Sequence, residues 1–139
     1  MFKVGIDDLN QNEVGVGFTH LNGNDLDELR VSAGDWRRST WMLKRAGTIT
    51  SWHIVKLSKH EESVFVLLGV DADTKEAICI SDVDMLANDC HAIRTVAGDI
   101  YTLFRKGLGR PTTDQILKLV WMLRAQGFET TLRNLVLVQ

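Results

Sequence analysis

The stretch from residue 49 to residue 104 constrains the fold of this chain most strongly. It contains five short β-type segments joined by local connections, at residues 51–57, 64–70, 77–81, 92–96 and 100–104. The second of these is apolar at both odd and even positions, which is typical of a central strand with both faces covered. Because the connections are local, the sequence predicts strands that pair with their chain neighbours in a meander.

An amphipathic helix is expected before this stretch, over residues 35–46. Ser32 or Gly34 is expected to cap its start, because serine and glycine are favoured where the first backbone N–H groups lack partners. Gly47 is expected to end it, since glycine accepts the left-handed conformation that often follows a helix.

A second helix is expected after the β-rich stretch. Thr112 and Gln115 have the spacing of a capping box, and Gly127 is expected to stop the helix. Its apolar stripe consists of Ile116, Leu119, Val120 and Leu123. Further short strands are expected at residues 2–6, 14–18 and 132–138.

This order of elements predicts an α+β fold in a single domain spanning residues 1–139. The expected architecture is an antiparallel or mixed sheet of about six to eight strands with the two main helices packed on one face. A chain of 139 residues, 45% of them hydrophobic, is long enough to bury its own core. No linker, low-complexity segment or internal repeat marks a domain boundary.

The sequence also bears on the compartment. No apolar run approaches the roughly 18 residues that a membrane-spanning helix needs, and the first residues do not resemble a signal peptide. The two cysteines, Cys79 and Cys90, do not make a disulfide framework in a chain of this length. We therefore expect a cytoplasmic protein with reduced thiols and no membrane partner.

The clearest functional signal is a run of positive charge around the first helix. Between Arg30 and Lys59 the chain carries seven Lys or Arg residues and a single acid, Asp35. Helical phasing places Trp36, Ser39, Thr40 and Leu43 on a face suited to docking on the core. The opposite face gathers a tryptophan among four cations, Arg37, Arg38, Trp41, Lys44 and Arg45. An aromatic ring among cations suits phosphate backbones, stacked bases or an acidic partner.

Charges of opposite sign are segregated along the chain, although the net charge is only −2. Residues 30–60 hold seven bases and one acid, whereas residues 61–104 hold two bases and nine acids. Either these segments are neighbours in the fold and cancel, which is the simpler interpretation, or the surface has two poles. In the second case one pole would meet a polyanion or a second copy of the chain.

Leu117 and Trp121 form a second candidate binding surface. Trp121 lies about 140° from Ile116 around the expected helix, away from its apolar stripe and beside Leu117. Either the helix is buried on two sides, or this pair of residues faces another protein. The second alternative predicts a symmetric homodimer, the commonest oligomer of soluble proteins.

The loop before the second helix is a candidate anion site. Gly107, Gly109, Arg110 and Thr112 stand just ahead of a helix start, where N–H groups and the helix dipole favour anions. The loop matches neither a P-loop nor a dinucleotide-binding motif. The alternative, which the sequence favours, is that the glycines serve the backbone of a strand-to-helix connection.

No motif predicts catalysis or metal binding. The common serine-nucleophile motifs and the zinc-protease motif are missing from the sequence. Cys79, Cys90 and His91 lack the spacing of a metal site, and a buried cysteine acting as a small hydrophobe explains them better. We therefore expect no catalytic residue, no metal and no cofactor.

Three functional classes remain open. The leading one is a small non-catalytic protein that binds an unidentified protein partner, as an adaptor or inhibitor, and forms a homo-oligomer. The second is a nucleic-acid-binding accessory protein that uses the helix at residues 35–46. A sequence pI near 6.1 argues against it, and a helix-turn-helix would need a helix at residues 50–59, where the sequence favours a strand. The third is a small enzyme with an unrecognised site.

Overall fold

The computed structural model describes residues 2–4, 17–21, 23–59, 62–126 and 135–137. The helix stop expected at Gly127 and most of the strand expected at 14–18 lie outside these residues. In chain order the elements are β1 (Phe2–Val4), β2 (Gly17–Leu21), the 3₁₀ helix η1 (Gly23–Glu28), α1 (Ala33–Thr40), β3 (Arg45–Lys59), β4 (Glu62–Asp71), β5 (Ala77–Leu86), β6 (Ala92–Thr95), β7 (Ile100–Leu103), α2 (Thr113–Ala125) and β8 (Leu135–Leu137).

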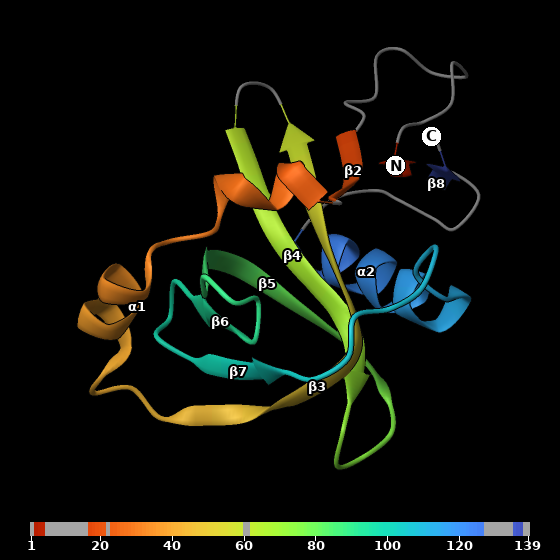
Figure 1. Ribbon diagram of the computed structural model, residues 1–139. Coiled ribbons are helices and arrows are strands. Elements are labelled where there is room, and N and C mark those ends of the chain that lie inside the picture. The colour runs from red at the N-terminus through yellow and green to blue at the C-terminus, as the bar shows by residue number, and fades with distance from the viewer. Residues whose placement is uncertain (1, 5–16, 22, 60–61, 127–134, 138–139) are drawn as a thin grey trace.

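The main sheet is a meander that closes into a small barrel. Consecutive strands from β3 to β7 pair antiparallel, and the first half of β3 also pairs in parallel with β7. The other half of β3 pairs with β2, whereas β1 and β8 form a separate two-stranded sheet. Figure 1 shows β3 curving from beside β7 at the bottom of the view to β2 at the top. A meander of five strands brings its first and last strands parallel, so it closes without a crossover.

The predicted α+β class is confirmed, and residues 50–59 lie in a strand, as the sequence favoured. The predicted sheet of about six to eight strands differs slightly from the observed one. Five strands form the antiparallel meander, and β1 and β8 pair with each other instead of joining it.

Two apolar cores lie on opposite faces of β3 and β4. The barrel interior contains Leu26, Leu29, Ile49, Trp52, Ile54, Leu67, Ile80, Val83, Leu86, Ile93 and Leu103. On the outer face, Val55, Leu57, Val66 and Leu68 pack against the predicted apolar stripe of α2. Successive strand residues point to opposite faces, so the doubly apolar segment at 64–70 serves both cores.

The prediction that both main helices pack on one face is wrong. α2 covers the outer face of β3 and β4, whereas Trp36 of α1 and Leu43 of the turn that follows it pack against Ala87, Ala92 and Ile100 near β6 and β7. Figure 1 shows the two helices on different sides of the barrel. The reason is closure: the outer surface of a closed sheet runs all the way around it, so helices can cover different strands on different sides.

β3 serves both halves of the barrel because it bends at Ser51. This residue has a φ of 49°, and the register with β4 shifts between Thr50 and His53. The fully buried Gln115 donates from Nε2 to the carbonyl oxygen of Ser51 at 3.0 Å. The side-chain oxygen of Gln115 also accepts the N–H of Thr112, which completes the predicted capping box. The start of α2 is therefore attached to the bend.

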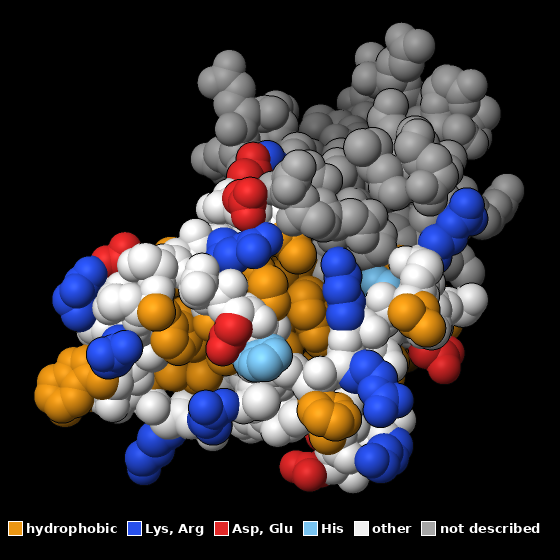
Figure 2. Space-filling view, viewed as in Figure 1, with side chains coloured by type: hydrophobic (Ala, Val, Ile, Leu, Met, Phe, Trp, Pro, Cys, Tyr) orange, Lys and Arg blue, Asp and Glu red, His pale blue; other side chains and the backbone are white. Residues whose placement is uncertain are grey.

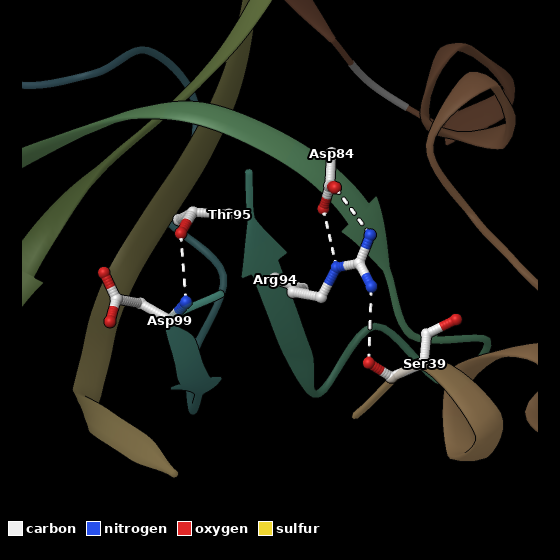
Figure 3. Close-up of polar contacts among 5 residues, drawn as sticks. All are labelled: Ser39, Asp84, Arg94, Thr95 and Asp99. Carbon is white, nitrogen blue, oxygen red and sulfur yellow. Dashed lines mark hydrogen bonds and ion pairs between the residues drawn. The ribbon is translucent and has the colours of Figure 1, made fainter. Parts of the chain in front are cut away.

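A partly buried ion pair joins α1 to the barrel (Figure 3). Arg94 of β6 donates from Nε and Nη2 to the two carboxylate oxygens of Asp84 in β5, at 3.0 and 2.6 Å. Its Nη1 donates to the carbonyl oxygen of Ser39 in α1 at 3.3 Å. The hydrogen bonds to Asp84 raise the pKa of Arg94 above its usual value. The guanidinium group of Arg94 thus connects β6 to β5 through a bidentate pair of hydrogen bonds, and it connects β6 to α1 through a third hydrogen bond.

We predict that Gly69→Ala destabilises the fold by about 1–3 kcal/mol, the usual cost of overpacking a core. A Cβ at Gly69 would overlap Cγ2 of the fully buried Ile49 and lie 3.0 Å from the carbonyl oxygen of Thr50, beside the bend. The matched control is Gly47→Ala, whose Cβ would lie 3.8 Å from the Tyr101 ring, an ordinary contact. Urea unfolding of the two variants measures the difference, and equal midpoints would contradict the prediction.

Candidate functional site

The first candidate site is built around α1. Ser32 is its N-cap, as one of the two predicted alternatives had it, and the serine Oγ accepts the N–H of Asp35 at 3.1 Å. The predicted end of the helix at Gly47 is wrong: α1 stops at Thr40, and Gly47 lies in β3. The chain leaves the helix early because Arg45 already pairs with Ile100 of β7.

The predicted division into a docking face and an exposed face holds. Thr40 is buried and Trp36, Ser39 and Leu43 are partly buried. All five residues predicted on the other face are exposed, namely Arg37, Arg38, Trp41, Lys44 and Arg45. Trp41 and the adjacent Met42 are each 75% exposed. Figure 2 shows hydrophobic side chains beside lysines and arginines at the left end of the molecule, where Figure 1 places α1.

A hollow of about 460 Å³ separates α1 and its following turn from the loop before β6. We call it the α1 hollow. The residues that line it are Ala33, Trp36, Arg37, Thr40, Trp41, Arg45, Ala87, Asn88, Asp89, His91, Ala92 and Thr102. Three of the predicted residues, Arg37, Trp41 and Arg45, meet there, whereas Arg38 and Lys44 do not line it. Sequence reasoning missed Asp89, His91 and Thr102 at this site, because they are about fifty residues away along the chain.

The charges around the α1 hollow are mixed. Arg38 pairs with Asp35, and this contact holds the pKa of the Asp35 carboxyl below its usual range. Arg45 donates to the hydroxyl of Thr102 across the hollow. Asp89 and His91 face each other at 3.6 Å between carboxylate and Nδ1. The lining thus offers two guanidinium groups and two indole rings to an anionic or aromatic ligand, with one carboxylate that selects against a uniform polyanion.

The second candidate site lies along the exposed face of α2. A groove of about 420 Å³ is lined by Lys75, Glu76, Ala77, Asp114, Leu117, Lys118 and Trp121. We call it the α2 groove. Trp121 is 66% exposed, and Leu117 is partly buried. The sequence left open whether the helix is buried on two sides or whether Leu117 and Trp121 face another protein. The described residues do not bury Trp121, so the first alternative does not hold for this side chain.

The candidate anion loop has structural reasons for its glycines. A Cβ at Gly107 would overlap the imidazole of the buried His53, and Gly109 has a φ of +65°. At the helix start, the side-chain oxygen of Thr112 already accepts the N–H of Gln115 at 3.2 Å. Arg110 is exposed. These observations favour the connector interpretation of this loop over an anion site.

No cluster of three or more His, Cys, Asp or Glu side chains that could hold a metal ion is found in the part of the chain that the structure describes. Asp84 is occupied by Arg94, and Cys79 lies beside Met122, with 3.5 Å between their sulfur atoms. Burial raises the pKa of Cys79 to about 12, so its thiol is a poor nucleophile near neutral pH.

Comparison of the chain with protein-family models, curated proteins and solved structures finds no match. The geometry of the two candidate surfaces is therefore the basis for inferring function. No helix within the described ranges is long and apolar enough to span a membrane.

We predict that Cys79 resists alkylation by iodoacetamide at mildly alkaline pH as long as the protein is folded. Its raised pKa leaves almost no thiolate, and α2 covers the sulfur. Cys90, which does not belong to the cluster packed under α2, provides the internal comparison. Peptide mass spectrometry should find Cys79 modified only after denaturation. Fast modification of Cys79 in the folded protein would reveal a reactive thiol and reopen nucleophilic catalysis.

Proposed function

We propose that this chain is a small, non-catalytic, cytoplasmic protein-binding module of the adaptor or inhibitor type. It engages an acidic segment of a partner protein through the α1 hollow. The observation that carries the proposal is the exposure of Trp41 and Met42 at 75% each, beside Arg37 and Arg45. Tryptophan, methionine and arginine are enriched at the centres of protein interfaces, and leaving two large apolar side chains in water is otherwise unfavourable.

The composition of the α1 hollow favours a protein partner over a nucleic acid. Asp89 lies in its lining, and Arg38 is paired with Asp35, so part of the positive charge is compensated. A surface that follows a phosphate backbone needs a continuous line of cations. The binding of single-stranded nucleic acid remains the second candidate, because an exposed indole between guanidinium groups is also a base-stacking platform.

The same proposal includes self-association through the α2 groove. Leu117 and Trp121 supply an apolar centre, and the charged side chains around them supply a polar rim. A homodimer would cover this surface and leave the α1 hollow free for the partner. The two surfaces involve different elements, so they can be tested separately.

We predict that Trp41→Ala removes most binding to an acidic, aromatic-containing peptide, because interface energy concentrates in such anchors at about 2 kcal/mol or more. Arg37→Glu with Arg45→Glu should have an equal or larger effect through charge repulsion. Folding should change little, since exposed substitutions usually stay within about ±0.5 kcal/mol. Fluorescence anisotropy with a labelled panel of acidic peptides and single-stranded oligonucleotides, at low and moderate salt, measures the binding.

The matched control is Arg105→Glu with Lys106→Glu, which makes the same change of net charge at exposed positions outside the α1 hollow. It should leave peptide binding unchanged. Binding of oligonucleotides alone, with a steep dependence on salt, would replace the protein-binding proposal by the nucleic-acid one. Equal losses in the control and in the Arg37 and Arg45 variant would show that only net charge matters and would refute the α1 hollow as the site.

A further inference from the structure

The outer edge of β5 is only partly paired. β6 pairs with β5 from Val83 to Leu86, and the N–H of Val96 donates to the carbonyl oxygen of Asp82 at 2.8 Å. Among the described residues, the segment Ala77–Ser81 has β4 as its sole strand partner. One side of this segment therefore forms an open edge, which we call the β5 edge.

Strand geometry identifies which backbone groups the β5 edge presents. The N–H of Asp71 donates to the carbonyl oxygen of Glu76 at 2.9 Å, so Glu76 directs its backbone toward β4. Backbone groups alternate in direction along a strand, and Ile78 and Ile80 therefore also point to β4. Ala77 and Cys79 point outward. A row of outward N–H and C=O groups is a template for pairing with another strand.

The α2 groove lies directly beside this edge. Ala77 belongs to both, and the sulfur of Cys79 lies 3.5 Å from that of Met122 in α2. A strand added to the β5 edge would thus pass alongside the exposed face of α2, where Trp121 is 66% exposed. Backbone pairing and apolar burial can occur in the same contact.

The charged residues of the α2 groove are balanced. Two bases, Lys75 and Lys118, stand with two acids, Glu76 and Asp114, around the apolar centre. Lys118 follows Asp114 by about one helical turn. When two copies of α2 lie antiparallel across a two-fold axis, the base of one copy can face the acid of the other. A patch that is neutral and self-complementary in this way suits a second copy of itself better than a strongly charged partner.

We infer that the β5 edge pairs antiparallel with the β5 edge of a second copy of this chain, with the two α2 grooves facing each other across the two-fold axis. This inference rests on the proposed self-association and specifies its geometry. Antiparallel pairing of identical strands is an isologous contact, which closes the assembly at two copies. It also removes an open edge that would otherwise invite aggregation.

Residue-resolved amide hydrogen exchange in dilute and concentrated protein tests the inference, together with light scattering. The mass should approach twice 15.6 kDa as concentration rises. The amides of Ala77 and Cys79 should gain protection over the same range. Those of Ile78 and Ile80, already bonded to β4, should stay protected throughout and serve as internal controls.

Trp121→Lys should shift the protein to monomer and abolish the added protection, because it replaces the apolar centre of each α2 groove by a cation, so that two new positive charges face each other across the axis. Leu108→Lys is the matched control, since Leu108 is 94% exposed and lies outside the α2 groove.

A dimer whose Ala77 and Cys79 amides gain no protection would overturn edge pairing but leave self-association standing. A strict monomer would overturn both, and a monomer with these amides already protected would mean that the chain itself covers the edge. None of these three results affects peptide binding at the α1 hollow.

Discussion

The hydrogen bond from Gln115 to the carbonyl oxygen of Ser51 joins the two features on which the fold depends, the bend of β3 and the start of α2. Before the bend β3 pairs with β7, and after it β3 pairs with β2, while β4 accompanies both halves. A straight strand of this length could not follow both partners around a small barrel. Gly69 opposite the bend leaves the room that Ile49 and Thr50 require. Closure of the sheet thus depends on a local bend of β3 that one buried amide holds.

Closure of the barrel also creates the α1 hollow. The parallel pairing of β3 with β7 carries Arg45 next to Thr102, and the ion pair of Arg94 with Asp84 holds the end of α1 through Ser39. Residues separated by about fifty positions in the chain therefore share one surface. The α2 groove forms independently, where α2 passes the turn between β4 and β5. The two surfaces therefore lie on different elements of the barrel.

Local signals explain which predictions succeeded. The capping box of Thr112 and Gln115, the apolar stripe of α2 and the doubly apolar β4 depend on residues close in sequence, and the structure has all three. Helical phase placed Trp41 opposite the docking face but left its exposure open, and the structure shows it 75% exposed just after the end of α1. The predicted stop at Gly47 failed because pairing of Arg45 with β7 competes with continuation of the helix, and β7 lies far along the chain. The predicted sheet of about six to eight strands differs slightly from the observed one for a similar reason, since long-range pairing decides which strands join a sheet.

The sequence by itself determined the α+β class, the strands of the meander and the face of α1 that carries exposed charge, because periodicity and capping act within a few residues. Tertiary structure alone decided that the meander closes and that the helices occupy different sides of it. It also brought Asp89 and His91 to Trp41, and among the described residues it left the outer side of Ala77–Ser81 without a strand partner, beside the groove that contains Trp121. These outcomes depend on which distant strand edges meet, and the side-chain pattern within one segment does not identify the strand that will pair with it.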